Sequence, residues 1–224
     1  MPDTKRRWIE ERKRDVYHRK AKELGYRSRA TFKLIQIDKT FRLLKQGAQV
    51  IDLGSSPGGW TQYAAEIVGP EGLVVAVDTE NLKDLGMKQV RFIRADVMDP
   101  SLESSIGTTL RRGSADLALS DLAPNMTGRY EVDHERQIAL AYRALDISRV
   151  FLKSGGNLVV KVFEGELSPS LERHVRTLFK RIKKFRPAAS RKRSSECYLV
   201  CLGFNGSKST SAVSHTAFRS ACLP

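Results

Sequence analysis

The chain has 224 residues with 39 Lys+Arg against 25 Asp+Glu, so its formal net charge at pH 7 is +14, and this surplus indicates a polyanionic partner. Hydrophobic residues make up 41% and aromatic residues 8% of the chain, enough to bury a core, which argues against a wholly disordered basic protein. A charged N-terminus without the apolar region of a secretory signal, and no apolar run near the roughly 18 residues that cross a bilayer, predict a soluble cytoplasmic protein away from membranes.

The first part of the chain is polar and helical in pattern. Residues 4–24 are compatible with a helix, and Gly25 marks its end. Ser28 is a candidate cap for a second helix, whose apolar residues recur at steps of three and four: Leu34, Ile37, Phe41 and Leu44. Lys33 lies on or beside this inward-facing apolar stripe.

From Gln49 onward, short apolar runs alternate with helical stretches. The pattern predicts six strands, at residues 49–53, 73–78, 90–96, 116–121, 157–163 and 196–204. It predicts helices at residues 58–68, about 131–153 and 170–183. This alternation is typical of an α/β fold with a doubly wound, mostly parallel sheet, whose carboxyl strand ends share the edge where ligands bind. We expect residues 1–27 to form a basic helical extension, 28–204 the folded domain, and 205–224 a disordered tail.

A glycine-rich turn joins the first strand to its helix in the segment DLGSSPGGW, which runs from Asp52 to Trp60. Its G-x-x-x-G-G spacing differs from the G-x-G-x-x-G of dinucleotide enzymes, which disfavours a nicotinamide oxidoreductase. Asp78 and Asp96 end the next two strands at the same edge. Together with Asp52 they suit a cofactor that has a ribose, an adenine amino group and a positive centre, such as S-adenosylmethionine. Strand-end Asp residues also cap turns, and Trp60 fits the core as well as a pocket wall.

Four further charged residues occupy unusual positions. Asp121 ends the fourth strand, Lys161 interrupts the apolar run LVVKVF, and Glu196 opens the last strand. A lysine in a strand suited to burial is costly unless it is paired or used. If the last strand runs antiparallel, its start meets the carboxyl ends of the others, so that Asp121, Lys161, Glu196 and Lys33 form one cluster beside the cofactor loop.

Five segments resemble the FtsJ family, the RlmE-type ribose 2′-O-methyltransferases, in family order over about residues 15–204: YRSRATFKLIQID, DLGSSPGGWTQ, SDLAPNMTG, VVKVF and SRKRSSECYLV. The resemblance implies a Rossmann-like S-adenosylmethionine-dependent methyltransferase fold with a mostly parallel seven-stranded sheet and helices on both faces, spanning residues 28–204. It implies S-adenosyl-L-methionine as cofactor, held at Gly58, Trp60, Asp78, Asp96 and Asp121. It also implies the catalytic tetrad Lys33, Asp121, Lys161 and Glu196, with Lys161 as proton acceptor.

The resemblance implies that the substrate is a uridine ribose in large-subunit ribosomal RNA. The segment VDHERQIAL, after the Asp121 motif, resembles archaeal members more than bacterial ones. The charge agrees with ribosomal RNA or the large ribosomal subunit as partner, because residues 1–33 carry a net +7 and residues 172–193 a net +9. A solvated basic face, a methyltransferase acting on tRNA, and a non-catalytic RNA-binding assembly factor remain alternatives. The absence of a spare apolar face favours a monomer. Cys197 and Cys201 share one side of a strand and are expected to be core thiols, and no metal site is expected.

Overall fold

A seven-stranded sheet forms the centre of the protein. The structure is a computed structural model, which describes residues 15–191 and 194–206. The strands are β1 (Gln49–Leu53), β2 (Leu73–Asp78), β3 (Val90–Arg94), β4 (Ala115–Ser120), β5 (Leu152–Phe163), β6 (Phe179–Phe185) and β7 (Glu196–Phe204). They lie in the order β3-β2-β1-β4-β5-β7-β6. Strands β1 to β5 are mutually parallel, whereas β7 is antiparallel to both of its neighbours.

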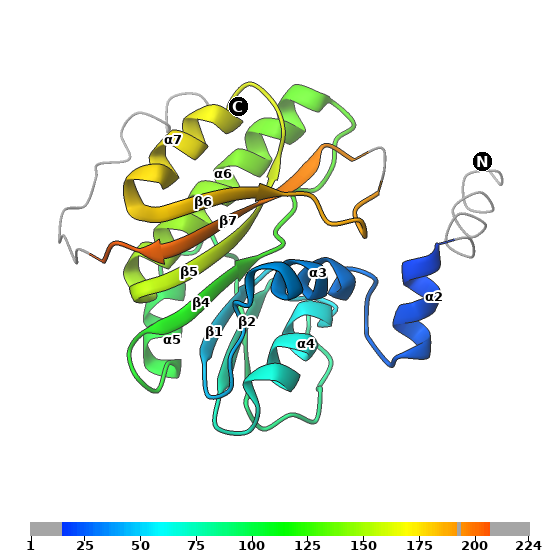
Figure 1. Cartoon of the computed structure of the whole chain (residues 1–224), viewed down its shortest axis with the longest axis vertical. Coiled ribbons are helices and arrows are strands. Elements are labelled where there is room, and N and C mark those ends of the chain that lie inside the picture. Colours follow the sequence, from blue (N-terminus) through cyan, green and yellow to red (C-terminus); the bar gives the residue numbers. More distant parts are fainter. Residues whose placement is uncertain (1–14, 192–193, 207–224) are drawn as a thin grey trace.

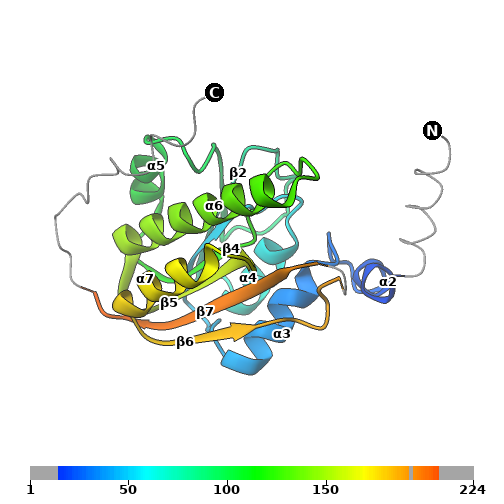
Figure 2. The ribbon, with the colours of Figure 1, turned by 90° about the horizontal axis from the view of Figure 1, so that it is seen from above.

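Helices cover both faces of this sheet. They are α2 (Val16–Glu23), α3 (Thr31–Phe41), α4 (Gly59–Val68), α5 (Leu102–Thr109), α6 (Tyr130–Phe151) and α7 (Ser168–Leu178). The ribbon shows α3 in front of the sheet and α2 to one side (Figure 1). Seen from above, α5, α6 and α7 lie on one face and α3 on the other (Figure 2). The expected α/β architecture, including the antiparallel last strand, is confirmed.

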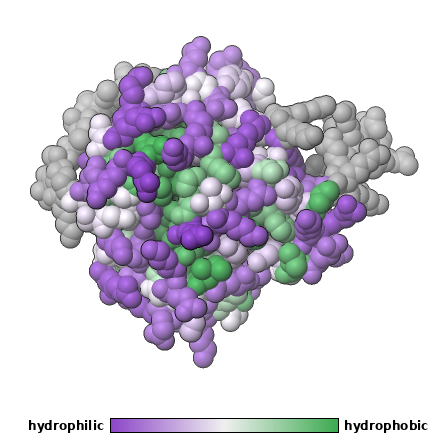
Figure 3. Space-filling view, viewed as in Figure 1, coloured by the Kyte–Doolittle hydropathy of each residue, from purple (hydrophilic) through white to green (hydrophobic). Residues whose placement is uncertain are grey.

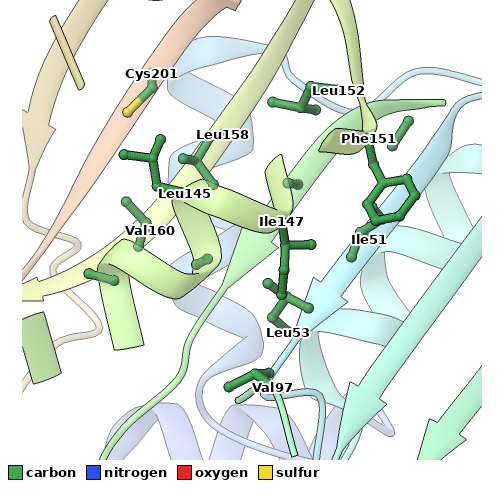
Figure 4. Close-up of a cluster of buried hydrophobic side chains, with 14 of the residues drawn as sticks. Ile51, Leu53, Val97, Leu145, Ile147, Phe151, Leu152, Leu158, Val160 and Cys201 are labelled. Atoms are coloured by element: carbon green, nitrogen blue, oxygen red, sulfur yellow. The ribbon is translucent and has the colours of Figure 1, made fainter. Parts of the chain in front are cut away.

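Two apolar clusters hold the layers together. The first joins the sheet to α6 and α7; Figure 4 shows part of it, with Ile51 and Leu53 of β1 near Ile147 and Phe151 of α6. The second joins the opposite face to α3 and α4, where Val50 of β1 packs. All five residues of β1 are buried, as expected for a central parallel strand covered on both faces. Cys197 and Cys201 are buried in the first cluster, which confirms them as core thiols.

The region after Leu178 departs from the sequence prediction. One helix was expected over residues 170–183, but α7 ends at Leu178 and Phe179–Phe185 form β6. Phe179 and Ile182 continue the helical spacing, which made the strand look like one more turn. In the structure, β6 pairs along most of its length with β7, and this long-range pairing outweighs the local pattern. Because β6 is an edge strand, its four Lys and Arg side chains can remain in water.

Smaller differences concern element ends. The sequence did not predict α5. The expected cap at Ser28 is wrong: α3 begins at Thr31 without a side-chain cap. Strand β5 begins at Leu152 rather than at residue 157, and α6 ends one residue before it, at Phe151. The expected helix over 4–24 is described only as α2, and most of the expected tail lies outside the described residues, so the domain boundaries stay predictions.

Candidate active site

The antiparallel pairing of β7 with β5 determines where the candidate residues meet. Glu196 pairs with Phe163 and Tyr198 pairs with Lys161, so the start of β7 lies at the carboxyl end of β5. Asp121 follows β4 directly at the same edge, and its backbone N–H donates to Leu53 O at 3.2 Å. The structure therefore brings the start of β7 to the edge that the sequence predicted.

Lys161 and Asp121 form the first ion pair of this edge. The Lys161 side chain is 7% exposed, and its Nζ lies 2.9 Å from Asp121 Oδ1. The same Nζ donates to the backbone oxygen of Asp121 at 2.7 Å. An ammonium group has three N–H donors, and Asp121 takes two of them. One position on Nζ is therefore left for a further partner.

Lys33 and Glu196 form the second ion pair, with Nζ 2.7 Å from Oε1 and both side chains nearly buried. The helix α3 carries Lys33 over the face of the sheet that Lys161 also faces. The Lys33 ammonium lies 5.8 Å from the centre of the Tyr198 ring. The four predicted residues thus lie in one cluster, as two neighbouring pairs of opposite charge.

Tyr198 lies between the two pairs, and the sequence analysis did not single it out. Its hydroxyl donates to Asp121 Oδ1 at 2.6 Å, and its ring is fully buried. Its position in the sequence could have indicated this role, because residues two apart on a strand share a face and Tyr198 follows Glu196 by two. Nothing in its residue type marked it, since a buried tyrosine in an apolar strand is usually core.

The charges of this cluster favour an ionised Asp121. Burial raises the pKa of its carboxyl, but the positive charges of Lys161 and Lys33 and the hydrogen bonds from Tyr198 and Lys161 outweigh burial and hold that pKa below its usual range. Burial, the charges of Asp121 and Glu196, and the hydrogen bond to Asp121 raise the pKa of Tyr198 well above its usual value. At neutral pH, Tyr198 is therefore a hydrogen-bond donor to a carboxylate.

The glycine turn packs closely under the residues that precede α3. Gly58 has a φ of +108°, and a Cβ there would lie 2.9 Å from Leu82 Cδ1. A Cβ on Gly59 would lie only 2.2 Å from Ser28 Oγ and 2.5 Å from Thr31 Oγ1. Glycine is thus favoured at Gly58 by its positive φ and required at Gly59 for space.

Asp78 and Asp96 are placed on this side of the sheet as turn acceptors. Asp78 accepts hydrogen bonds from the backbone N–H groups of Ser56 and Glu80, each at 2.8 Å, so it fastens the glycine turn to the end of β2. Asp96 is exposed and accepts from Met98 N at 2.9 Å. Both carboxylates retain further acceptor capacity, because each oxygen can take a second donor.

Asp52 is a buried acid at the base of the turn. Its Oδ2 accepts from Thr61 Oγ1 at 2.6 Å, while Oδ1 has no hydrogen-bond partner among the described residues. Burial raises its pKa to about 7; the Thr61 hydrogen bond opposes this shift, and the charges of Asp121 and Asp78 add to it. The buried Oγ of Ser55 likewise lacks a described partner. Unpartnered acceptors among several carboxylates fit a ligand with a positive centre and donor groups.

Trp60 belongs to the core between α3, α4 and the sheet. It is 3% exposed, its Nε1 donates to Ala30 O at 2.8 Å, and its ring centre lies 5.6 Å from that of Tyr198. Of the two interpretations that the sequence left open, packing is the one these contacts describe. A cofactor contact of Trp60 remains a prediction.

Within residues 15–191 and 194–206, no group of three or more His, Cys, Asp or Glu side chains is arranged to hold a metal ion. Among the same residues, no helix combines the length and apolar character needed to cross a membrane.

Several known proteins are similar to this chain over most of its length. A relative from Methanothermobacter thermautotrophicus is 42% identical over 213 residues, covering 94% of this chain and 99% of its own. A relative from Coxiella burnetii is 40% identical over 210 residues, covering 89% and 97%. Both are named ribosomal RNA large subunit methyltransferase E. A Plasmodium falciparum crystal structure, described as that of a ribosomal RNA methyltransferase, covers 81% of this chain and 100% of its own with a TM-score of 0.72 and 25% identity.

The match extends to a family as a whole. Residues 26–204, which include all seven strands and the two ion pairs, match the family model described as FtsJ-like methyltransferase. The archaeal and bacterial relatives both align over nearly their full lengths. The chain is therefore a member of the FtsJ-like methyltransferase family.

Proposed function

We propose that this methyltransferase transfers the methyl group of S-adenosyl-L-methionine to the ribose 2′-hydroxyl of a uridine in large-subunit ribosomal RNA. The observation that carries the proposal is the pair of buried ion pairs, Lys161–Asp121 and Lys33–Glu196, at the ligand edge of the sheet. The names of the curated relatives support the ribosomal substrate. A ribosomal substrate in turn supports a cytoplasmic location.

The cofactor would lie against the glycine turn. Gly58 allows close approach to the backbone, and the carboxylates of Asp78, Asp96 and Asp121 offer acceptors for hydroxyl and amino groups. The buried Oδ1 of Asp52, which has no hydrogen-bond partner among the described residues, is a further polar atom beside the start of α4. When bound, S-adenosylmethionine supplies a methyl group on a positively charged sulfur atom.

Lys161 would act on the substrate hydroxyl. Asp121 fixes the direction of its Nζ through two hydrogen bonds, which leaves one position on nitrogen for the 2′-oxygen. In the ammonium form that position donates to the oxygen and stabilises developing negative charge. In the amine form it accepts the hydroxyl proton. Both forms use the same geometry, so Lys161 orients the nucleophile in either case.

Lys33 and Glu196 would position the ribose. Their ion pair closes the cluster on the α3 side, and the Lys33 ammonium stays beside Asp121 and Tyr198. Recognition of the 2′-hydroxyl itself selects RNA over DNA, because DNA lacks that group.

The test is methyl incorporation from labelled S-adenosylmethionine into purified large ribosomal subunits, large-subunit ribosomal RNA and bulk tRNA, in parallel. We expect incorporation into ribosomal RNA at a single uridine, mapped as a 2′-O-methyl site, and none with Lys161→Ala. Incorporation into tRNA alone would refute the ribosomal substrate. Full incorporation by Lys161→Ala would refute the catalytic assignment.

A further inference from the structure

A basic hollow lies at the opposite end of β7 from the candidate active site. It has a volume of about 280 Å³ and is formed where the end of α3 meets the first residues of β6 and the last residues of β7. Arg42 and Lys45 line it from the α3 side, and Lys180 and Arg181 line it from β6. In the space-filling view, hydrophilic side chains border an apolar strip on the face where β6 and β7 lie (Figure 3).

Among the described residues, no acidic side chain compensates the charge of this hollow. No Asp or Glu lines it, and none of its four cations forms a salt bridge with another described residue. Elsewhere on β6 the situation differs, because Lys184 is paired with Glu172 at 2.8 Å and with Glu164 at 3.3 Å. Four unpaired cations around one concave surface produce a local positive potential that attracts phosphate groups.

Arg42 occupies a backbone conformation that favours glycine. It ends α3 with φ 54° and ψ 53° and is the only non-glycine residue with positive φ in the described part of the chain. Asp38 holds this turn: its Oδ1 accepts from the N–H groups of Leu43 at 2.8 Å and Leu44 at 2.9 Å. Glycine is the usual residue where a helix ends in this conformation. An arginine in this conformation costs stability, and it places a long cation in the hollow. We infer that the cation has a binding role that offsets this cost.

The hollow and the proposed catalytic residues lie at opposite ends of the same strand, β7. Leu202 lines it and Glu196 belongs to the active site, so six residue steps along β7 separate the two, about 20 Å at roughly 3.3 Å per step. Lys183 lies between them on the α3 side, because it pairs with Val200 of the α3-side cluster, and it is exposed. This distance corresponds to roughly six stacked nucleotides at about 3.4 Å each.

We propose that the hollow binds a backbone phosphate of the RNA substrate several nucleotides from the methylated ribose, as a second contact that holds the RNA across the α3–β6 side of the protein. This inference rests on the proposed function for the identity of the RNA. Phosphate is the group recognised, and the contact is independent of base sequence.

Arg42→Gly is the deciding variant, because it removes the cation while relieving the backbone. We expect its melting temperature to equal or exceed that of the wild type. Binding of the full-length protein to a large-subunit ribosomal RNA transcript should weaken about fivefold or more, and the slope of log Kd against log salt should fall by about 1. The double variant Arg42→Gly with Lys180→Ala should bind the transcript still more weakly and show a still smaller salt slope.

Lys184→Gln is the matched control. It removes the same formal charge, but from a lysine of β6 on the α7 face of the sheet, which two glutamates already neutralise. Its salt slope should remain that of the wild type, so an equal loss in both variants would show that only net charge matters and would overturn the inference. Unchanged RNA binding by Arg42→Gly would overturn it too, as expected if the hollow bound an acidic protein instead.

Measuring RNA binding by titration tests this inference separately from the proposed function, because binding needs no methyl transfer. Wild-type methylation of the transcript together with unchanged binding by Arg42→Gly refutes the second contact alone. If the wild type methylates tRNA instead, the proposed substrate fails, and the same variants titrated with that tRNA still support or overturn the phosphate contact.

Discussion

Replacing Asp52 by Asn should make the protein more stable at alkaline pH. The folded state raises the pKa of this buried acid from 3.8 to about 7, so folding opposes its ionisation. The wild type therefore loses stability as pH rises from about 4 to about 7, and the loss is constant above that range. At about 1.4 kcal/mol per pKa unit, the full loss is about 4 kcal/mol. Asn cannot ionise, retains an acceptor for Thr61 Oγ1 and has nearly the same volume.

The assay is urea unfolding of both proteins at pH 5 and pH 8. Part of the loss is already present at pH 5, so the advantage of Asp52→Asn should be larger at pH 8 by about 2 to 3 kcal/mol. Glu80→Gln, which removes an exposed carboxylate from the neighbouring turn, serves as the control and should shift the difference little. An advantage that is the same at both pH values would show that Asp52 is ionised without cost, and the interpretation of its burial would be wrong.

Three further predictions follow from the site. Lys161→Ala should abolish methyl transfer while calorimetry still detects S-adenosylmethionine binding, since among the proposed cofactor residues Lys161 is bonded to Asp121 alone and the glycine turn, Asp78 and Asp96 stay in place; near-normal turnover would contradict its role. Tyr198→Phe removes the 2.6 Å hydrogen bond to Asp121 but keeps the ring beside Trp60, so the free energy of unfolding should fall by about 1 to 2 kcal/mol and methyl transfer by about tenfold, and unchanged turnover would show that this bond does not orient Asp121. Gly59→Ala should lower the melting temperature sharply because its Cβ would lie 2.2 Å from Ser28 Oγ, and Ser28→Gly in the same chain should recover part of the loss; a stable Gly59→Ala protein would show that the segment before α3 can move away.

Much of the fold could be read from local pattern. Apolar, β-branched runs such as residues 49–53 and 73–78 predicted buried parallel strands, because a strand covered on both faces needs apolar side chains on both. Charged residues at odd positions were equally informative. Lys161 inside an apolar strand and Asp121 at a strand end predicted a common edge, and the structure pairs them at 2.9 Å. Their catalytic roles remain proposals.

Tertiary structure decided what local pattern could not. Phe179–Phe185 became a strand because it pairs with β7, although its apolar residues continue the spacing of α7. Tyr198 looked like core until the register of β7 against β5 brought its hydroxyl to Asp121. The hollow that Arg42 lines exists only because the end of α3 and the start of β6, which are far apart in sequence, lie side by side in the fold. Sequence determined which residues are unusual, and the long-range pairing of strands determined which of them meet, because that pairing depends on the whole chain.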